Sequence, residues 1–398
     1  MSFALRVTFW LLTTGVGGRL IIDESDGTLT ALELVKKYGY RGRAYTVITS
    51  DGYKLGVHRM SRKEGHNMQL LPVLIIHGLL GSSADWVLIG PENAIGYQLA
   101  NAGYDVWLGN TRGNRYSRQH EEMSPSYVPF WNFSWHEKGM HDLPAMIDFM
   151  LNATGHRQIY YIGYSEGTTT YFVMTSTRTE YNAKIRLAHA MAPAVLLDDM
   201  RSTLLTSLAD ISPVLIPLGQ GANFVELLRW SETQNGLLRN LCNPSVTWNP
   251  CPGVFGDAFG PNPESLNVHV IQAMMGHCPS GASIKELKHY DQVIKSGIFQ
   301  PYQEDTVYNE QAPYNLTAST VPVHIYYGEN DWIVHPKNVR QLATVLPNVR
   351  ELQAIGGKNT QYTHIDFMIG KRVNTLVYKK ILFNLWNDTQ MRLRQGNF

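Results

Sequence analysis

The sequence predicts an α/β fold in which a mostly parallel sheet alternates with helices, with a mainly helical segment inserted late in the chain. Short apolar runs of the kind that form buried strands recur with helix-compatible stretches between several of them. These runs lie near Leu74, Val106, Tyr160, Ala188 and Val321. Strand-like apolar runs stop after Pro193 and resume near Val321. We therefore expect a cap at residues 196–317 between two parts of one core, residues 19–195 and 318–398.

The first strands of the core are expected to pair through a hairpin. Asp51-Gly52 separates two alternating runs, and this dipeptide favours the tight turn that joins antiparallel strands. The chain has 398 residues, of which 44% are hydrophobic, so there is enough apolar material for a large core and a cap. The net charge of +1 gives no reason to expect nucleic acid or a strongly acidic partner.

The N-terminus has the composition of a secretory signal peptide, which we assign to residues 1–18. Arg6 precedes an apolar stretch at residues 7–12 and a run of small residues suited to cleavage. The stretch is too short to span a membrane, and a buried N-terminal segment is the alternative interpretation. N-glycosylation acceptor sequences begin at Asn132, Asn152, Asn315 and Asn387. We therefore expect a secreted glycoprotein without a stable membrane anchor, with the lysosome as the alternative destination.

The segment Gly163-Tyr164-Ser165-Glu166-Gly167 is the clearest candidate for a catalytic turn. It follows an apolar run, residues 159–162, and precedes helix-compatible residues 168–174. A serine flanked by glycines in this way can occupy a sharp, strained strand-to-helix turn that exposes its hydroxyl. Ser165 is therefore the candidate nucleophile, and an ordinary tight turn is the alternative.

A serine hydroxyl needs a base to remove its proton and a third group to orient that base. The strand candidate at residues 321–328 leads into a turn that contains Asp331, and His364 follows the break at Gly356-Gly357. The order serine, acid, histidine on separate loops suits an acyl-transfer site at the end of a parallel sheet. We therefore expect Asp331 to be the acid and His364 the base.

Three rival residues are weighed against this assignment. His335 lies too close in sequence to Asp331 for acid and base to occupy separate loops. Asp366 is only two residues from His364, which favours a role in orienting the loop. Glu329 would require a different turn from the one that Gly328 indicates.

Acyl transfer also requires donors for the negatively charged oxygen of the transition state. The backbone N–H of Glu166, directly after the nucleophile, supplies one. The loop after the strand candidate at residues 72–76 should supply the second, and we assign it to the N–H of Leu79. Glycines in that loop let the backbone approach a ligand closely, although His77-Gly78 alone could simply end a strand.

These motifs together resemble the acid lipases of animals, a family that includes gastric, lysosomal and insect secreted lipases. The resemblance covers nearly the whole chain after the first thirty residues. It is carried by residues 45–53, the His77-Gly78-Leu79-Leu80 loop, residues 102–114, Asp142-Leu143-Pro144-Ala145 and Phe367 after His364-Ile365-Asp366. The resemblance implies an α/β-hydrolase core, a cap, a triad at Ser165, Asp331 and His364, and oxyanion donors at Leu79 and Glu166.

One departure from the family concerns the turn around the nucleophile. The family usually has Gly-His-Ser-Gln-Gly, whereas Tyr164 and Glu166 occupy the two variable positions here. A carboxylate beside the nucleophile could stabilise the charged form of His364 and raise its pKa. Activity is therefore expected to be weak below about pH 5, where even an unperturbed histidine is largely protonated.

The three cysteines are too few for a disulfide-built scaffold. Cys242 and Cys251 flank a short loop that a disulfide could close, and the resembling family has a comparable bridge in its cap. Cys278 would then be free, as a small buried hydrophobic residue. The cysteines and histidines show no zinc-ligand spacing, and the expected chemistry requires neither a metal nor an organic cofactor.

The sequence therefore predicts a serine lipase that hydrolyses carboxylic esters of neutral lipids through an acyl-enzyme. Triacylglycerols are the expected substrates, and cholesteryl esters are a further class. A lipase of this kind would contact a lipid–water interface transiently through the mouth of its cap. A catalytically silent, lipid-binding relative is the alternative, which the presence of all three triad residues disfavours.

Overall fold

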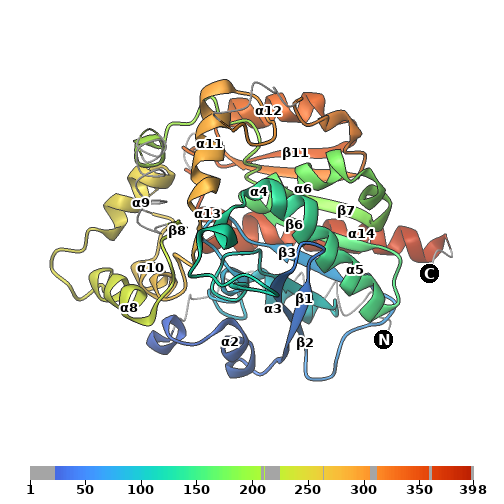
Figure 1. The fold of residues 1–398 in the computed structure, drawn as a ribbon. Coiled ribbons are helices and arrows are strands. Elements are labelled where there is room, and N and C mark those ends of the chain that lie inside the picture. The colour runs from blue at the N-terminus through green and yellow to red at the C-terminus, as the bar shows by residue number, and fades with distance from the viewer. Residues whose placement is uncertain are drawn as a thin grey trace.

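One large sheet with helices on both faces organises the molecule (Figure 1). The computed structural model describes residues 23–207, 210, 225–262, 264–304, 312–357 and 361–395. Within these ranges a nine-stranded sheet has the order β1-β2-β4-β3-β6-β7-β10-β11, and β5 pairs with β2. The strands are β1 (Arg41–Ile48), β2 (Tyr53–Ser61), β3 (Val73–Ile76), β4 (Val106–Gly109), β5 (Gln119–His120), β6 (Ile159–Tyr164), β7 (Ile185–Met191), β10 (Val323–Gly328) and β11 (Val349–Ile355).

The pairing of these strands is mostly parallel. β4, β3, β6, β7, β10 and β11 pair in parallel along the sheet, whereas β2 is antiparallel to both β1 and β4. The β1–β2 hairpin turns at Asp51-Gly52, where Gly52 has a φ of 90° that favours glycine. The predicted α/β class, the parallel sheet and the hairpin are therefore confirmed.

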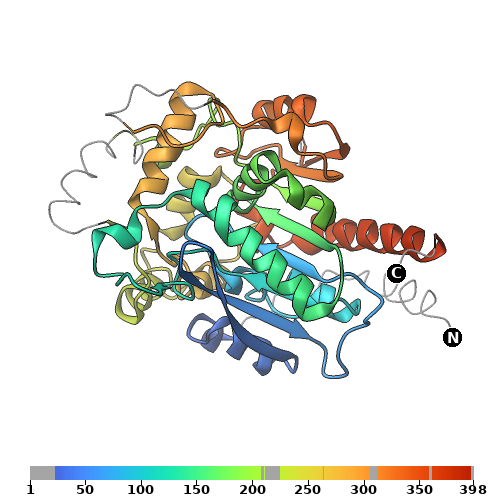
Figure 2. The same ribbon diagram turned by 45° about the vertical axis from the view of Figure 1, so that its right-hand side comes forward.

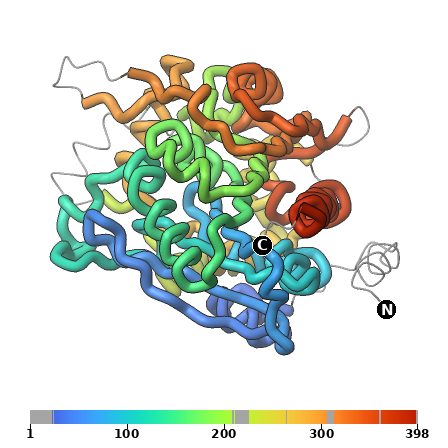
Figure 3. Tube along the Cα trace, turned by 90° about the vertical axis from the view of Figure 1, so that its right-hand side faces the viewer, coloured from blue at the N-terminus to red at the C-terminus, as the bar shows by residue number. Residues whose placement is uncertain are grey.

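The helices cover both faces of the sheet. In Figure 2 the green helices α5 and α6 lie in front of the strands, and Figure 3 shows α14 nearly end-on. The helices are α2 (Ala31–Lys37), α3 (Ile95–Asn101), α4 (Trp135–Glu137), α5 (Leu143–Thr154), α6 (Glu166–Thr177), α8 (Glu232–Leu241), α9 (Cys251–Phe259), α10 (Val268–Met275), α11 (Ile284–Ser296), α12 (Pro336–Val345), α13 (Asp366–Ile369) and α14 (Lys379–Arg394). Short π-helical turns precede α5 (Lys138–Asp142) and α14 (Asn374–Tyr378).

Alternation of side chains along the central strands produces two apolar layers. In β3, Val73 and Ile75 join the layer that contains α3 and α14, whereas Leu74 and Ile76 join the layer of α5, α6 and α12. All four side chains are fully buried because both faces of the strand are covered. This explains why the strand has a continuous apolar sequence.

β11 is a strand that the sequence analysis did not predict. Its residues alternate between exposed and partly buried positions, with charged side chains at Arg350 and Glu351. β11 is the outermost strand next to β10, so one face and one edge lie open to water. A half-exposed edge strand lacks the apolar run by which the buried strands were recognised.

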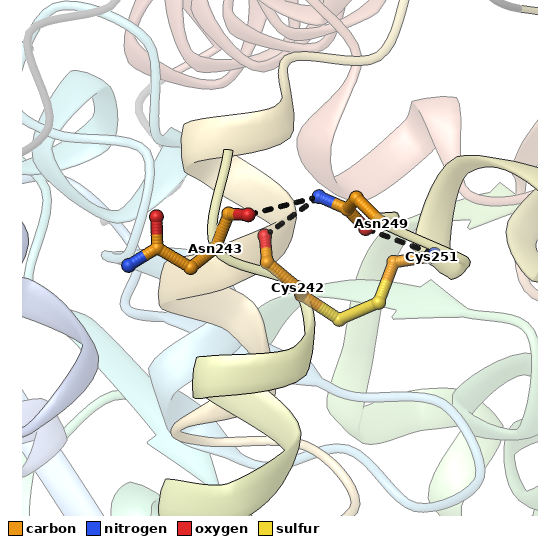
Figure 4. Close-up of a disulfide and its surroundings, with 4 residues drawn as sticks. All are labelled: Cys242, Asn243, Asn249 and Cys251. Atoms are coloured by element: carbon orange, nitrogen blue, oxygen red, sulfur yellow. Dashed lines mark hydrogen bonds between the residues drawn. A yellow bond between two sulfur atoms is a disulfide. The ribbon is translucent and has the colours of Figure 1, made fainter. Parts of the chain in front are cut away.

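The described parts of the chain between β7 and β10 contain α8, α9, α10 and α11, with the two-residue strands β8 (Glu226–Leu227) and β9 (Ala282–Ser283) paired to each other. In Figure 1 its helices α8, α9 and α10 lie on the opposite side of the molecule from α14. A disulfide joins Cys242, at the end of α8, to Cys251, at the start of α9, with Cα atoms 5.5 Å apart (Figure 4). The Asn249 side chain adds a hydrogen bond to the Cys242 carbonyl, at 3.1 Å.

Candidate active site

Ser165 occupies the sharp turn between β6 and α6. Its φ of 52° and ψ of −118° are unusual for a residue with a side chain, which confirms the predicted strained turn. A Cβ on Gly167 would lie 2.5 Å from the Ile76 carbonyl oxygen, and one on Gly163 would lie 2.9 Å from the Gly167 carbonyl carbon. Gly167 therefore allows the turn to pack directly against the end of β3, and Gly163 allows the close approach of the backbone within the turn.

The structure brings Ser165, His364 and Asp331 together although they are far apart in the sequence. His364 Nε2 lies 2.9 Å from Ser165 Oγ, and His364 Nδ1 lies 2.8 Å from Asp331 Oδ2. Asp331 and His364 are only 1% and 2% exposed. An imidazole held between a hydroxyl and a carboxylate can accept the hydroxyl proton while its other nitrogen donates to the carboxylate.

Asp331 is held by the backbone of its own loop, directly after β10. Its Oδ1 accepts hydrogen bonds from the N–H groups of Ile333 and Val334, at 2.9 and 2.8 Å. These two donors leave Oδ2 directed toward His364. The acid is therefore oriented by the turn in which the sequence places it.

The loop that carries His364 is fixed from two sides. The Asp366 carboxylate accepts hydrogen bonds from the Thr363 N–H at 2.7 Å and from Asn262 Nδ2 at 2.8 Å. The Tyr164 hydroxyl donates to the His364 carbonyl at 3.0 Å, and the two rings are 5.1 Å apart. Sequence reasoning left the role of Tyr164 open, because the partner lies 200 residues away.

The three rival residues have hydrogen-bond or ion-pair partners outside the Ser165–His364–Asp331 group. His335 is the N-cap residue of α12, where its ring nitrogen accepts a hydrogen bond from the Lys337 N–H at 3.4 Å. Glu329 forms an ion pair with Arg340 at 3.1 Å. Asp366 holds the histidine loop, which is the orienting role expected for it.

The two expected oxyanion donors belong to segments that adjoin Ser165. Glu166 is the first residue of α6, and an N–H at this position has no acceptor within the helix. Leu79 and Ser165 line the same cavity, and a Cβ on Gly78 would lie 3.1 Å from Ser165 Cβ. This close approach places the loop after β3 beside the nucleophile, where its backbone can face a bound ester.

His77 stabilises that loop in its neutral form. Burial lowers the pKa of His77 to about 4, so the ring is uncharged at neutral pH. Its Nδ1–H donates to the Gly78 carbonyl at 2.7 Å, and its Nε2 accepts from Asn114 Nδ2 at 3.1 Å. The His77-Gly78 pair thus ends a strand and also fixes the backbone before Leu79.

An apolar cavity of about 180 Å³ opens beside Ser165 and His364. Its wall is formed mainly by aliphatic, methionine and aromatic side chains. These include Leu79, Ile333, Ile365 and Met368, together with Ala194, Leu197, Met200, Phe259, Met274, Leu287 and Ile294 from the chain between β7 and β10. Asp85 is an exception, and burial raises the pKa of this carboxyl to about 7. Such a wall suits a hydrocarbon chain.

The carboxylate of Glu166 has partners other than the triad. It accepts a hydrogen bond from Lys138 Nζ at 2.8 Å and one from the Tyr290 hydroxyl at 3.3 Å. The positive charge of Lys138 offsets the negative charge of Glu166. The expected stabilisation of charged His364 by Glu166 therefore loses its physical basis. The expected weakness below pH 5 stays an untested prediction.

The remaining predicted residues lie in different surroundings. Asn132, Asn152 and Asn315 are exposed, but Asn387 is half-buried within α14, and Thr389 of the same acceptor sequence is 1% exposed. Cys278 is unpaired and lines the cavity. The predicted signal peptide lies outside the described residues.

Metal-binding groups and membrane-spanning helices are both absent from the described ranges. No group of three His, Cys, Asp or Glu side chains in that part of the chain is arranged to hold a metal ion. None of the described helices combines the length and hydropathy needed to cross a membrane.

The chain is similar to known proteins over most of its length. The alpha/beta hydrolase fold family matches residues 72–361, and the partial alpha/beta-hydrolase lipase region matches residues 31–90. Lipase 1 of Drosophila melanogaster is 39% identical over 368 residues, which cover 90% of this chain and 80% of that protein. Gastric triacylglycerol lipase of Rattus norvegicus is 32% identical over 388 residues, which cover 94% of this chain and 96% of that protein.

Solved structures agree with this class at the level of the fold. A soluble variant of monoglyceride lipase from Saccharomyces cerevisiae superimposes with a TM-score of 0.54 at 16% identity, over 87% of this chain and 96% of that chain. Fold and site thus define an alpha/beta hydrolase. The chain belongs to the acid lipases of animals within that family, as its motifs predict, and it is therefore a carboxylic ester hydrolase.

Proposed function

We propose that the protein is a serine lipase in which Ser165 is the nucleophile, His364 the base and Asp331 the orienting acid. The observation that carries the proposal is the continuous hydrogen-bonded path from Asp331 through His364 to Ser165 beside an apolar cavity. These three groups supply the nucleophile, proton acceptor and orienting carboxylate that ester cleavage by a serine requires.

The proposed reaction has two acyl-transfer steps. His364 accepts the Ser165 proton while Oγ attacks the ester carbonyl, and the N–H groups of Leu79 and Glu166 bind the oxygen that becomes negative. His364 then protonates the departing alcohol, which leaves an acyl-Ser165 ester. Water, deprotonated by His364, attacks this ester and releases the fatty acid, which regenerates the hydroxyl of Ser165.

The proposed substrates are esters of neutral lipids with an acyl chain that enters the apolar cavity. Triacylglycerols are the primary candidates, since the Rattus norvegicus relative is a gastric triacylglycerol lipase. Cholesteryl esters are a further candidate class. The wall of the cavity recognises a chain by contact with methylene groups and offers few polar partners that would select a charged substrate.

We also propose that residues 196–317 are the cap over a core formed by residues 19–195 and 318–398. Support comes from the position of this segment between β7 and β10 and from its contribution to the cavity wall. The described part of this segment places Leu197, Phe259 and Leu287 on the same cavity as Ser165. A cap of this kind would define the space available to the acyl chain.

Transient contact with a lipid–water interface is supported by exposed apolar side chains in the segment that carries the disulfide. These side chains are Leu237, Leu241, Val246, Trp248 and Val254, and Trp248 is 80% exposed. Residues 233–256 carry a single charged side chain, Arg239. An exposed tryptophan in a nearly uncharged segment suits the boundary between water and lipid.

The proposed compartment is the secretory pathway, with release from the cell as the first destination and the lysosome as the alternative. The Cys242–Cys251 disulfide is consistent with an oxidising environment. Asn132, Asn152 and Asn315 are accessible to glycosylation, whereas Asn387 is disfavoured because its acceptor threonine is buried in α14. Glycopeptide mass spectrometry of the secreted protein would identify the modified positions.

Covalent labelling separates the proposed lipase from a silent lipid-binding relative. A fluorophosphonate probe should label wild-type protein at Ser165 and should not label the Ser165→Ala variant. Hydrolysis of triacylglycerol, cholesteryl and p-nitrophenyl esters, measured at acidic and neutral pH, should disappear in the same variant. Folded wild-type protein that neither reacts with the probe nor cleaves any of these esters would contradict the proposal.

A further inference from the structure

Three ionisable side chains form a buried cluster that begins at the residue after the proposed nucleophile. Lys138 Nζ lies 2.8 Å from Glu166 Oε1 and also donates a hydrogen bond to Glu286 Oε2. The three side chains are 3%, 2% and 0% exposed, respectively. Charges are seldom buried so completely unless they are paired, so the position of each side chain is closely determined by the other two.

The cluster joins three elements that are distant in the sequence. Lys138 begins the π-helical turn before α5, Glu166 begins α6, and Glu286 lies in the first turn of α11. Glu286 also accepts a hydrogen bond from the Ser283 N–H at 2.9 Å, which closes the start of α11. The lysine therefore links the nucleophile helix of the core to a helix of the proposed cap.

Both carboxylate partners of Lys138 are connected to the proposed active site. Glu166 follows Ser165, and its backbone N–H is one of the proposed oxyanion donors. On α11, Tyr290 lies one turn after Glu286, donates a hydrogen bond to Glu166 at 3.3 Å and lines the cavity beside Ser165. A change in the cluster would therefore alter the positions of a proposed oxyanion donor and of the cavity wall together.

We propose that Lys138 is a positioning residue for ester hydrolysis, which holds the oxyanion donor of Glu166 and the cap helix α11 in one fixed arrangement through its two carboxylate partners. This inference rests on the proposed function and deepens it. Lys138 touches neither the triad nor the cavity, so its effect on the reaction is transmitted entirely by Glu166 and Glu286.

The charges of the cluster make this arrangement sensitive to pH. One lysine faces two carboxyl groups, and burial raises the pKa of Glu286 to about 8 although Lys138 opposes the shift. The other titratable groups nearby are Tyr290 on α11 and His77 at the end of β3, which both stay uncharged at neutral pH because burial shifts their pKa values. Glu286 therefore retains its proton at neutral pH.

Raising the pH removes that proton and leaves an excess negative charge in a dry environment. Because the folded-state pKa of Glu286 is raised above its ordinary 4.5, its stabilising contribution is complete below about pH 4.5 and is lost as the pH rises through about 8. The extra charge would loosen the contact between α6 and α11, and activity should fall in the same range.

The isosteric variant Glu286→Gln tests the proposal, because it keeps the shape but cannot ionise. On water-soluble p-nitrophenyl butyrate, kcat/KM of the wild type should fall above about pH 8. The Glu286→Gln variant should stay within about twofold of the wild type at pH 7 and should keep its activity above pH 8. An alkaline fall that is identical in the two proteins would overturn the proposal.

The Lys138→Met variant tests the link itself. At pH 7 its kcat should fall by about tenfold or more, with a smaller change in KM, because a misplaced oxyanion donor affects the transition state more than substrate binding. Lys184→Met is the matched control, since Lys184 pairs with Asp148 at the surface and should leave kcat unchanged. A Lys138→Met enzyme with wild-type kcat would contradict the positioning role.

Two controls keep the outcomes distinct. If Lys138→Met does not fold, the alkaline profile of Glu286→Gln still decides the question. Inactivity of the wild type towards every ester, together with absence of labelling at Ser165, would refute the proposed lipase function. An active wild type whose variants behave like it would refute only the role of the cluster.

Discussion

The turn that carries Ser165 and helix α8, in the chain between β7 and β10, are packed to very different degrees. A methyl group on Gly167 of the turn would lie 2.5 Å from the Ile76 carbonyl oxygen, whereas one on Gly236 in α8 would meet nothing within 4 Å. Other parts of the chain between β7 and β10 are packed as closely as the turn, since a Cβ on Gly260 would lie 2.4 Å from the Asn330 carbonyl oxygen. Close backbone packing thus sets the position of Ser165, whereas α8 leaves room for substitution.

The largest effect on activity is expected from a substitution that disturbs the proposed triad without changing its shape. Asp331→Asn should lower kcat by about 10⁴-fold, because the amide favours the wrong tautomer of His364. Thermal unfolding should show that the variant remains folded. A loss of less than about tenfold would show that Asp331 does not orient the base.

Paired glycine substitutions test the difference in packing directly. Gly167→Ala should destabilise the protein by about 2–4 kcal/mol, because its methyl group overlaps the end of β3. Gly236→Ala, within α8, should be neutral or stabilising by up to about 1 kcal/mol. Urea unfolding of both variants measures these changes, and equal effects would remove the distinction between the two regions.

Substitution in the cavity wall should alter substrate choice more than the reaction. Leu287→Ala enlarges the cavity and should shift the ratio of kcat/KM for long and short acyl chains by about threefold to tenfold. The rate of fluorophosphonate labelling at Ser165 should stay near that of the wild type. A large fall in labelling with unchanged chain-length preference would reverse this expectation.

The smallest expected effect concerns the support of the histidine loop. Tyr164→Phe removes the hydrogen bond to the His364 carbonyl and should raise the activation free energy by about 1 kcal/mol. The corresponding loss in kcat is a few-fold and should appear with soluble esters. A kcat equal to that of the wild type would show that Asp366 alone is sufficient to hold the loop.

The sequence predicts the fold and the proposed reacting residues because their signals are local. Ser165 lies between glycines at the end of an apolar run, and Asp331 directly follows another strand. The ordering of these segments along parallel strands then brings them to one edge of the sheet. His364 was predicted from its place after the Gly356-Gly357 break and from the order serine, acid, histidine.

Other features depend on contacts between distant segments and have no local signal. Lys138 and Glu286 are 148 residues apart, and neither belongs to a recognisable motif. Asn387-Asp388-Thr389 matches the acceptor pattern for N-glycosylation, but it lies in a helix where the threonine is buried. Strand β11 was overlooked because its exposed edge carries charged residues.

The order of the strands has a consequence for the synthesis of this protein. β10 and β11 complete the sheet beside β7, and the loops that follow them supply the proposed acid and base. A ribosome therefore delivers the proposed nucleophile long before the two residues proposed to activate it, so the nascent chain should be unable to cleave esters at that stage. Hydrolytic activity would appear only after the loop that carries His364 has been synthesised.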